Sequence, residues 1–334
     1  MRLNPRSVLV RRFSALLAAV ALFGLAGAAS AANTGLVFVS NEKSSTITVL
    51  DSDDRVIDSF ATCARPRGMH FSADRKEFFV GCADDSVIVV YDVATRELLR
   101  RIRGVEEPET FDLHPNGRHL YISNEEDATM TVYDVETGAF IAEFDTGEEP
   151  EGVQVTADGR LVFVASEAAN LVHVIDVEAQ EVIADILVDT RPRRFALTPD
   201  GSELWVSAEL AGMVDIIDVE SLTLIDDIAF LPTGFRKEQV TPVDLLITRD
   251  GTRAYVALGR ANHVAVVDVV KREIIEYILV GKRPWGLALS HDQKKLYVAN
   301  GLSDDVSIID TESLTVTKSV AVGMVPYGIL IDDH

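Results

Sequence analysis

The chain has 334 residues, of which 47% are hydrophobic, and its 53 acidic residues outnumber 31 basic ones to give a formal charge of −22. This apolar content is enough for a large core. The acidic balance repels phosphate backbones and therefore argues against nucleic acid as the main ligand.

The first 31 residues have the pattern of a secretory signal peptide. Four arginines lie before residue 13, an uncharged apolar run covers residues 15–29, and the small residues Ala29-Ser30-Ala31 end it. The run is short for a membrane span, which needs about 20 residues, and no second long run follows. We therefore expect cleavage after Ala31, a single domain at residues 32–334 and a periplasmic location, with an uncleaved anchor as the alternative. Arg11-Arg12 leaves both the general and the twin-arginine export routes open.

From residue 36 onward, one sequence unit recurs about every 42 residues. Three markers keep this period: a proline before a short apolar stretch, an Asp-Gly or related turn, and an aspartate that ends an apolar run. Such a period indicates a repeat architecture. The prolines stand 42 residues apart, except for one interval of 50. They are Pro66, Pro108, Pro150, Pro192, Pro242, Pro284 and Pro326.

Each unit has the pattern of four short β-strands. In the unit that begins at Pro150, the expected strands cover residues 153–156, 161–165, 171–177 and 182–188. They are rich in Val and Ile and are separated by Gly, Asp and Asn. Asp158-Gly159 supplies a tight turn, because glycine tolerates a positive φ and aspartate bonds nearby backbone. A four-stranded unit of this length is the size of a propeller blade.

The repeat predicts an all-β, seven-bladed β-propeller of four-stranded antiparallel blades. The first unit lacks its first strand, since Leu36–Ser40 matches the second strand of the repeat, and the last unit consists of a lone first strand at Gly328–Ile331. We therefore expect these two segments to pair, so that the C-terminal strand joins the N-terminal blade and closes the ring. An open solenoid of β-repeats is the alternative, but it would expose two sheet edges.

Parts of the repeat resemble a known family. Residues 295–300 (Lys-Leu-Tyr-Val-Ala-Asn) and 305–310 are similar to the YVTN-repeat propellers, and residues 120–124 and 254–257 repeat the first pattern. The chain as a whole looks most like the β-propeller proteins associated with pyrroloquinoline quinone (PQQ)-dependent catabolism. That resemblance implies a periplasmic, non-catalytic binding or scaffold protein that serves quinoprotein alcohol oxidation.

The chain lacks the pattern of a quinoprotein enzyme. Residues 134–138 (Asp-Val-Glu-Thr-Gly) resemble the docking repeat of those enzymes, but Ala142 stands where they carry tryptophan. They also carry adjacent cysteines, which this sequence lacks. We therefore expect no bound PQQ, and the sequence indicates no other cofactor.

The sequence predicts neither a metal site nor a catalytic centre. Its seven histidines and two cysteines show none of the spacings typical of zinc or haem sites. His70 and His114 fall on inner strands, where a ligand in the channel could reach them, although a structural role is the simpler interpretation. The aspartates that recur in the units are interpreted as turn caps.

Departures from the repeat gather at one end of the predicted ring. The residue after each proline leans toward the central mouth and differs from blade to blade. Eight extra residues within residues 230–241 add a segment on the same face, which could lie over the mouth. Guanidinium groups and aromatic rings there suit a small anionic ligand or a periplasmic protein partner, and a solvated rim is the alternative. The predicted binding residues are Arg67, Glu109, Glu151, Arg193, Arg236, Trp285 and Tyr327.

Two other functions remain open at this stage. One is a lactonase-like hydrolase, because some seven-bladed propellers resemble that class. Its site would need clustered Glu, His and Arg, and Glu109, Glu151, Arg67 and Arg193 supply part of that set. The other is a non-catalytic subunit that docks a periplasmic electron-transfer partner, in association with a quinoprotein dehydrogenase system.

Cys63 and Cys82 are the only cysteines, and an exported protein folds in an oxidising compartment. Cys63 lies three residues before Pro66, and Cys82 ends the second strand of the same unit. These two strands are neighbours in a blade, so the sequence predicts a disulfide. Two buried free thiols are the alternative.

Overall fold

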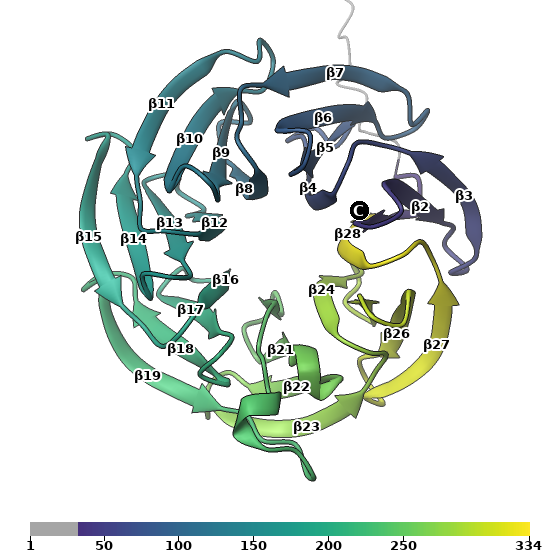
Figure 1. The fold of residues 1–334 in the computed structure, drawn as a ribbon. Helices are drawn as coiled ribbons and strands as arrows, with labels where there is room; N and C mark the ends of the chain where they lie inside the picture. The colour runs from purple at the N-terminus through teal and green to yellow at the C-terminus, as the bar shows by residue number, and fades with distance from the viewer. Residues whose placement is uncertain (1–32) are drawn as a thin grey trace, which may run out of the picture. The chain divides into compact units, whose positions relative to one another are not determined.

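Within residues 33–334, seven four-stranded sheets stand around a central axis (Figure 1). The computed structural model describes these residues, so the predicted signal peptide lies outside the described part of the chain. The fold is the predicted all-β, seven-bladed propeller, and neighbouring strands in each blade are antiparallel. None of the helices in residues 33–334 is long and apolar enough to cross a membrane.

Each blade is ordered from an inner strand at the axis to an outer strand at the rim. The first blade has β28 (Pro326–Asp332), β1 (Leu36–Asn41), β2 (Thr46–Leu50) and β3 (Val56–Ala61). The second has β4 (Pro66–Phe71), β5 (Glu77–Cys82), β6 (Val87–Asp92) and β7 (Leu98–Arg103). The third has β8 (Pro108–Leu113), β9 (His119–Asn124), β10 (Thr129–Asp134) and β11 (Phe140–Asp145).

The remaining four blades repeat this order. The fourth has β12 (Pro150–Val155), β13 (Leu161–Ser166), β14 (Leu171–Asp176) and β15 (Glu181–Leu187). The fifth has β16 (Pro192–Leu197), β17 (Glu203–Ala208), β18 (Met213–Asp218) and β19 (Thr223–Ala229). The sixth has β20 (Leu245–Ile247), β21 (Arg253–Ala257), β22 (His263–Asp268) and β23 (Glu273–Leu279), with the 3-10 helices η1 (Lys237–Gln239) and η2 (Gly259–Ala261). The seventh has β24 (Pro284–Leu289), β25 (Lys295–Asn300), β26 (Asp305–Asp310) and β27 (Thr315–Ala321).

The inner strands begin at the repeat prolines, with the short β20 as the exception. Strand β12 begins at Pro150, three residues earlier than the strand predicted from residue 153. The reason is that Pro150 already pairs with Ser166, after which the register shifts before Val153. Proline is tolerated at the first residue of a strand, where its missing N–H is not required. The residue after each proline is therefore held on a rigid strand next to the axis.

The turns are capped as predicted. The Asp158 carboxylate accepts hydrogen bonds from the Thr156 hydroxyl at 2.6 Å and the Arg160 N–H at 3.0 Å. Gly159 between them has a φ of 73°, a conformation that a side chain disfavours. Asp176 accepts from the Ala179 N–H at 2.8 Å in the next turn of the same blade. These aspartates stabilise the turns of the fold.

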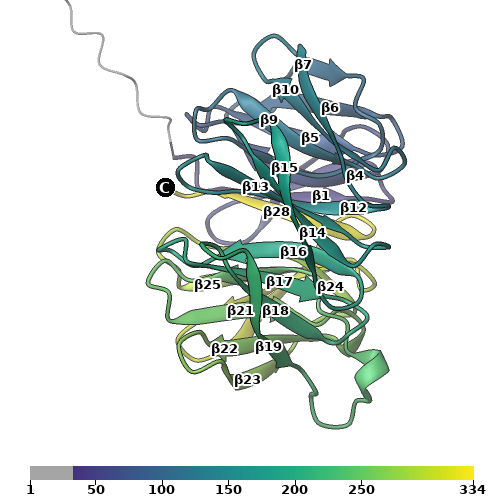
Figure 2. The same cartoon turned by 90° about the vertical axis from the view of Figure 1, so that its left-hand side faces the viewer.

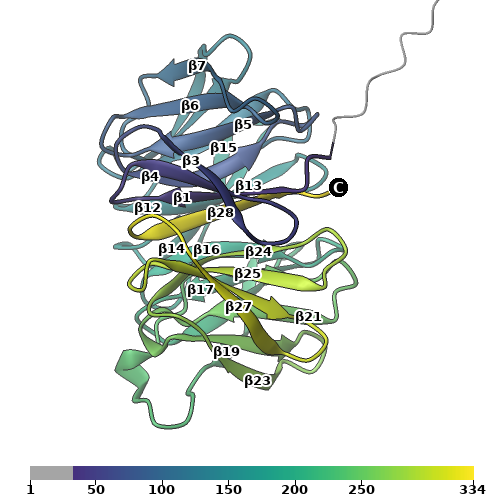
Figure 3. The ribbon, with the colours of Figure 1, turned by 90° about the vertical axis from the view of Figure 1, so that its right-hand side faces the viewer.

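The ring is closed by the two segments that the sequence singles out. In the first blade β28 pairs with β1, with Val37 opposite Ile331, Phe38 opposite Leu330 and Val39 opposite Ile329. Just before β1, the Thr34 N–H donates to the Asp332 carboxylate at 2.9 Å. Figures 2 and 3 show β28 next to β1 and the end of the chain on the face opposite the first residues of β28. The predicted closure is confirmed.

The hydrophobic core lies between the blades. Phe38 and Ile47 of the first blade pack in one cluster with Phe78 and Val80 of the second, and their side chains are fully buried. Comparable clusters join the other neighbouring pairs, so every sheet is covered on both faces. This explains strands that are apolar on both sides, because each face of a blade belongs to a different cluster.

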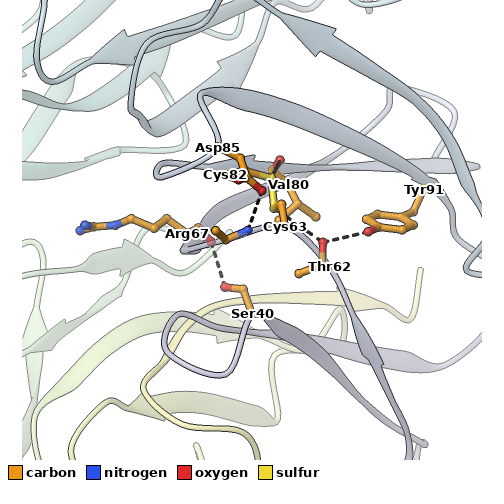
Figure 4. Close-up of a disulfide and its surroundings, with 9 residues drawn as sticks. Ser40, Thr62, Cys63, Arg67, Val80, Cys82, Asp85 and Tyr91 are labelled. Carbon is orange, nitrogen blue, oxygen red and sulfur yellow. Dashed lines mark hydrogen bonds between the residues drawn. A yellow bond between two sulfur atoms is a disulfide. The ribbon is translucent and has the colours of Figure 1, made fainter.

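The predicted disulfide joins Cys63 and Cys82, whose Cα atoms lie 5.7 Å apart (Figure 4). It links the loop before β4 to the end of β5. Close by, the Ala64 N–H donates to the Asp85 carboxylate at 2.8 Å, and the hydroxyls of Thr62 and Tyr91 are 2.8 Å apart. The bridge therefore holds the loop that leads into β4 and its Arg67.

The extra residues of the sixth blade lie at the outer edge of the ring, beside β19 and β23, and do not cover the mouth (Figures 1 and 2). The Leu231 N–H donates to the Tyr277 hydroxyl of the outer strand β23 at 2.9 Å. The Phe235 ring packs against His263 with its centroid 5.5 Å away. These contacts draw the segment outward, which corrects the prediction that it lies over the mouth.

Candidate functional site

Six of the seven predicted binding residues gather around the axis at the proline end of the inner strands. Five of them interact directly: Arg67, Glu109, Glu151, Arg193 and Tyr327 form what we call the ionic ring. Each of these side chains is nearly or fully buried. The sixth, Trp285, stands beside the ring, half-buried. Arg236 is exposed at the start of η1, where its N–H bonds the Gln239 side chain, and lies apart from the others.

Arg193 is the most densely paired member of the ionic ring. Its guanidinium lies 3.0 Å from Glu151, 2.7 Å from Glu167 and 3.0 Å from Glu209, and its side chain is only 6% exposed. A buried guanidinium with three carboxylate partners is a structural centre of the mouth. Glutamates of its own chain thus already pair with Arg193, which also lines the cavity at the mouth, and its predicted role in ligand binding stays a prediction.

Arg67 is paired in the same manner on the other side of the axis. Its Nε lies 2.7 Å from the Glu109 carboxylate, and its Nη2 donates to the Tyr327 hydroxyl at 3.1 Å. The guanidinium also lies over the Tyr327 ring, 4.5 Å from the centroid. The Tyr327 hydroxyl in turn donates to Glu151 at 3.0 Å. Residues from four blades are thus joined at the axis.

Four glutamates that the sequence analysis missed complete the mouth. Each follows the second strand of its blade, where the loop to the third strand returns to the face that carries the prolines. A recurring signal marks them, because glutamate comes one residue after the end of that strand in four of the seven units. They are Glu42, Glu125, Glu167 and Glu209.

Around these groups lies a cavity of about 310 Å³, which we call the mouth cavity. Its more accessible cations come from the loops that precede the prolines and from η2. Arg191 is 38% exposed and reaches Glu167 at 2.6 Å and Glu209 at 3.2 Å. Arg260 is exposed and has no ion-pair partner within residues 33–334. A small polar molecule that enters the cavity meets these groups first.

Trp285 forms an aromatic wall at the same mouth. The guanidinium of Arg283 lies 4.6 Å from its ring centroid and that of Arg193 lies 5.2 Å away. The Tyr327 ring is 5.7 Å from it. Aromatic rings beside cations hold those cations in place and offer an apolar face to a ligand.

The buried carboxyl groups of the mouth differ in charge state. Burial raises the pKa of Glu109, and the neighbouring charge of Glu151 raises it further. Burial together with Glu151 raises the pKa of Glu167 to about 8, although Arg193 and Arg191 oppose this. At Glu151, burial is outweighed by Arg193, Arg67 and Arg194, which hold its pKa well below the usual range. Glu151 is therefore ionised, whereas Glu167 exchanges a proton near neutral pH.

Three carboxylates lie close together without forming a convincing cation site. Oxygen atoms of Glu107, Glu109 and Glu125 are within 4.8 Å of one another. The Arg65 guanidinium bonds Glu107 and lies 3.2 Å from Glu109, and Arg67 takes the other Glu109 oxygen. Guanidinium groups thus already supply the positive charge at this cluster.

Of the two histidines predicted on inner strands, His70 lies on β4, whereas β8 ends at Leu113 and His114 lies in the turn that follows it. The Nε2 atom of His70 is 3.2 Å from the Asp112 carboxylate and its Nδ1 atom is 2.6 Å from the Phe71 carbonyl oxygen. Burial lowers the pKa of His70, but the hydrogen bond and charge of Asp112 outweigh it, so the net shift is upward. Neither His70 nor His114 lines the mouth cavity.

Two family models match overlapping parts of the chain. The model for YNCE-like beta-propellers matches residues 59–198, and the model for the lactonase, 7-bladed beta-propeller, matches residues 187–329. Both halves of the ring match propeller families. No curated protein matches the chain.

Solved propellers are similar to the chain in fold. A periplasmic gluconolactonase of Pseudomonas aeruginosa, PpgL, is 22% identical with a TM-score of 0.75, covering 89% of this chain and 98% of its own. A functionally unknown protein of Desulfotomaculum acetoxidans is 17% identical with a TM-score of 0.76 and the same coverage. The hydrazine synthase of Kuenenia stuttgartiensis is 20% identical with a TM-score of 0.71, covering 79% and 88%. At these identities the likeness shows the fold alone.

Proposed function

We propose that this propeller is a lactone hydrolase whose reaction takes place in the mouth cavity. The observation that carries the proposal is the carboxyl of Glu167, which has a pKa of about 8 and lies between the guanidinium groups of Arg191 and Arg193. A carboxylate that can take a proton from water, next to fixed positive charge, can serve as the general base of ester hydrolysis. The match of residues 187–329 to the lactonase propeller model supports the same reaction class.

Glu167 acts as the proton carrier in this reaction. Its ionised form takes a proton from a water molecule as the water oxygen bonds to the lactone carbonyl carbon. The tetrahedral intermediate then collapses, the ring C–O bond breaks, and the protonated Glu167 returns its proton to the departing ring oxygen. Lactone and water are thereby converted to a hydroxy acid, with no other reactant consumed.

Arg191 and Arg260 provide the positive charge for the reacting oxygen. Both line the mouth cavity, and their side chains are more exposed than that of Arg193, so they can face a substrate. A guanidinium stabilises the oxyanion of the intermediate and then the carboxylate of the product. Trp285 offers an apolar face for the ring of the substrate.

The test is hydrolysis of glucono-δ-lactone and of simple γ- and δ-lactones, followed by proton release and corrected for the uncatalysed reaction. We expect Glu167→Gln to lower kcat/KM by about 10²-fold or more, because it removes the proton carrier. The wild-type rate should rise with pH up to about 8, as Glu167 loses its proton. Glu42→Gln is the matched control, since Glu42 lines the same cavity and, among residues 33–334, forms an ion pair with Arg65 alone, at 3.6 Å.

Two results would overturn the assignment. A Glu167→Gln variant as fast as the wild type would exclude Glu167 as the proton carrier. A wild type that hydrolyses none of the lactones faster than water would exclude the function. The second outcome favours a binding or scaffold role, which the mutual pairing of Arg67 and Arg193 with glutamates would then serve by fixing the shape of the mouth.

We further propose a periplasmic location and a link to PQQ-dependent catabolism. The location is supported by the composition of residues 1–31 and by the Cys63–Cys82 disulfide, which persists in oxidising compartments. Cell fractionation tests it, and recovery in the cytoplasm with free thiols would contradict it. Co-purification with a quinoprotein dehydrogenase from alcohol-grown cells tests the link, which rests on the resemblance of the repeats.

A further inference from the structure

The outer strands of the second and third blades carry opposite charges at equivalent positions. Arg101 and Arg103 lie on β7, and Glu143 and Asp145 lie on β11, 42 residues later in each case. Each pair of residues aligns in the same register with the third strand of its own blade. The two blades share a hydrophobic cluster, and Figure 1 shows β7 and β11 next to each other on the rim. All four charged side chains are exposed.

These four side chains have no ion-pair partner within residues 33–334. Other charges on the outer strands are already paired: Arg100 of β7 lies 2.6 Å from Glu77, and Asp185 of β15 lies 2.6 Å from His173. On the other side of β7, the single acidic residue of β3, Asp58, lies 3.2 Å from Arg96. The charges of Arg101 and Arg103 therefore remain available to a carboxylate of another molecule.

Basic residues are rare on the outer strands. Strand β7 carries Arg100, Arg101 and Arg103, whereas the other outer strands together carry only Lys318, on β27. The Lys318 ammonium already donates to the Asp54 carbonyl oxygen. Among the outer strands of residues 33–334, unpaired charges of both signs thus occur on neighbouring blades only at β7 and β11.

Exposed apolar side chains adjoin the charges on both strands. Leu98 and Leu99 begin β7, Phe140 and Ile141 begin β11, and all four are between 39% and 55% exposed. Similar apolar pairs begin β15 and β19, so this feature alone does not select a partner. Once the charges align two surfaces, burial of these side chains stabilises the contact.

We propose that the protein forms a two-fold symmetric dimer in which β7 of each copy faces β11 of the other. A two-fold axis parallel to the ring axis, just outside the second and third blades, brings these strands together with the same ends level. Arginines then meet carboxylates and apolar pairs meet apolar pairs, and the contact occurs twice. Strand β7 against its own copy would set arginine against arginine, so both strands are needed for a self-complementary surface.

Local attraction has to act against the overall negative charge, which is −22 for the whole chain. At an ionic strength of about 0.15 M the screening length is about 8 Å, so distant charges of the two copies interact weakly. Guanidinium and carboxylate groups in direct contact are screened much less and can form paired hydrogen bonds. Two strands per copy make a small contact, so we expect a dimer that dissociates on dilution.

This interface is independent of the proposed reaction. It lies on the outer strands, whereas the residues of the mouth cavity lie at the inner strands and their loops. Association is measured without a lactone, and hydrolysis is measured without reference to the oligomeric state. Failure of either proposal therefore leaves the other testable.

The experiment is sedimentation velocity of the purified protein between about 1 and 100 µM. We expect the wild type to change from monomer to dimer over this range. The variant Arg101→Glu/Arg103→Glu and the variant Glu143→Arg/Asp145→Arg should each dimerise at least tenfold more weakly, because like charges then meet at both contacts. An equimolar mixture of the two variants should dimerise again, since the glutamates of one copy meet the arginines of the other on both strands.

The matched control is Glu273→Arg/Glu276→Arg on β23 of the sixth blade. It changes the net charge as much as Glu143→Arg/Asp145→Arg does, at exposed positions outside the interface, and it should dimerise as the wild type does. The thermal unfolding temperature of each variant checks folding. If one reversal variant does not fold, the chain with all four charges exchanged provides the second test, because it should dimerise by itself.

Three results would overturn the proposal. The first is a wild type that stays monomeric throughout the concentration range. The second is dimerisation that neither charge reversal weakens, or two weakened variants whose mixture does not associate. The third is a series of species larger than the dimer, which would indicate a head-to-tail contact instead of a two-fold one.

Discussion

Replacement of Arg193 by methionine should destabilise the propeller strongly at neutral pH. The substitution keeps much of the side-chain volume and removes the guanidinium that approaches Glu151, Glu167 and Glu209 at 2.7 to 3.0 Å. Removing one partner of a buried ion pair typically costs 3–5 kcal/mol. Among the three carboxyls Glu151 bears most of this cost, because its pKa is well below the usual range in the wild type, whereas Glu167 already holds a proton near neutral pH.

The magnitude also follows from the protonation of Glu151. Without Arg193, the buried Glu151 carboxyl is expected to take up a proton, because the neutral form is less costly to bury. Protonating a carboxyl whose ordinary pKa is near 4.3 costs roughly 4 kcal/mol at about pH 7.5. In the wild type, the lowered pKa of Glu151 adds to the free energy of unfolding at any pH above the pKa that this carboxyl has in the unfolded chain. This stabilisation is lost as the pH falls toward the lower pKa of the folded protein. The deficit of Arg193→Met should therefore shrink by about 1.4 kcal/mol for each pH unit between about 7.5 and 5.

Urea unfolding of both proteins at these two pH values measures the deficit. Arg260→Met is the matched control, since Arg260 is exposed without an ion-pair partner in residues 33–334, and its effect should stay within about 0.5 kcal/mol. An Arg193→Met variant that loses less than about 1 kcal/mol, or a loss that does not change with pH, would refute the reasoning that Arg193 stabilises the fold through Glu151.

Two further predictions concern the same fold. Replacing Cys63 and Cys82 by serine should lower the free energy of unfolding by about 3 kcal/mol, because the bridge closes a loop across a sequence separation of 19; equal urea midpoints of oxidised and variant protein would contradict this. The pKa of Glu167 in the folded protein is raised to about 8, so the folded state holds its proton more tightly than the unfolded chain does. The free energy of unfolding of the wild type should therefore fall relative to that of Glu167→Gln as the pH rises from about 4.5 to 8. Urea unfolding of both proteins at several pH values checks the sign, and a gap between them that is independent of pH would contradict it.

The fold could be predicted because one sequence unit, with the pattern of a four-stranded blade, recurs along the chain. Leu36–Ser40 and Gly328–Ile331 matched two strands of one unit, and their pairing followed from the need to bury both sheet faces. The disulfide followed in the same way, because Cys63 and Cys82 flank neighbouring strands of one blade. Local sequence was sufficient wherever each blade repeats the same contacts.

The charge state of the mouth was not predictable from the period. The residues after the prolines could be found as departures from the repeat. Whether the Arg193 side chain faces solvent or pairs with Glu167 depends on how closely the fourth and fifth blades approach each other, which the repeat does not give. Arg236 shows a related limit, because the length of an insertion does not give its direction. The Leu231–Tyr277 hydrogen bond turns that segment toward the outer strand.

A departure from the repeat can also be purely structural, as the fourth blade shows. There His173 lies 3.0 Å from the Ser166 hydroxyl and 2.6 Å from the Asp185 carboxylate, the same order of groups as in a Ser-His-Asp triad. Ser166 is fully buried, and the Gly147 N–H already donates to the His173 Nε2 atom at 2.8 Å, which occupies the lone pair that a general base needs.

The corresponding positions of other blades explain this constellation. In the third blade Asn124 bonds Thr131 at 3.0 Å, and in the seventh Asn300 bonds Ser307 at 2.9 Å, so Ser166 and His173 replace a pair that joins the second and third strands. The triad-like group therefore satisfies buried polar atoms inside a blade. Glu167, one residue after Ser166, differs because it leaves the strand and lines the mouth cavity. Function in this ring is to be sought where a departure from the repeat borders a cavity, and the mouth cavity at Glu167 meets that condition.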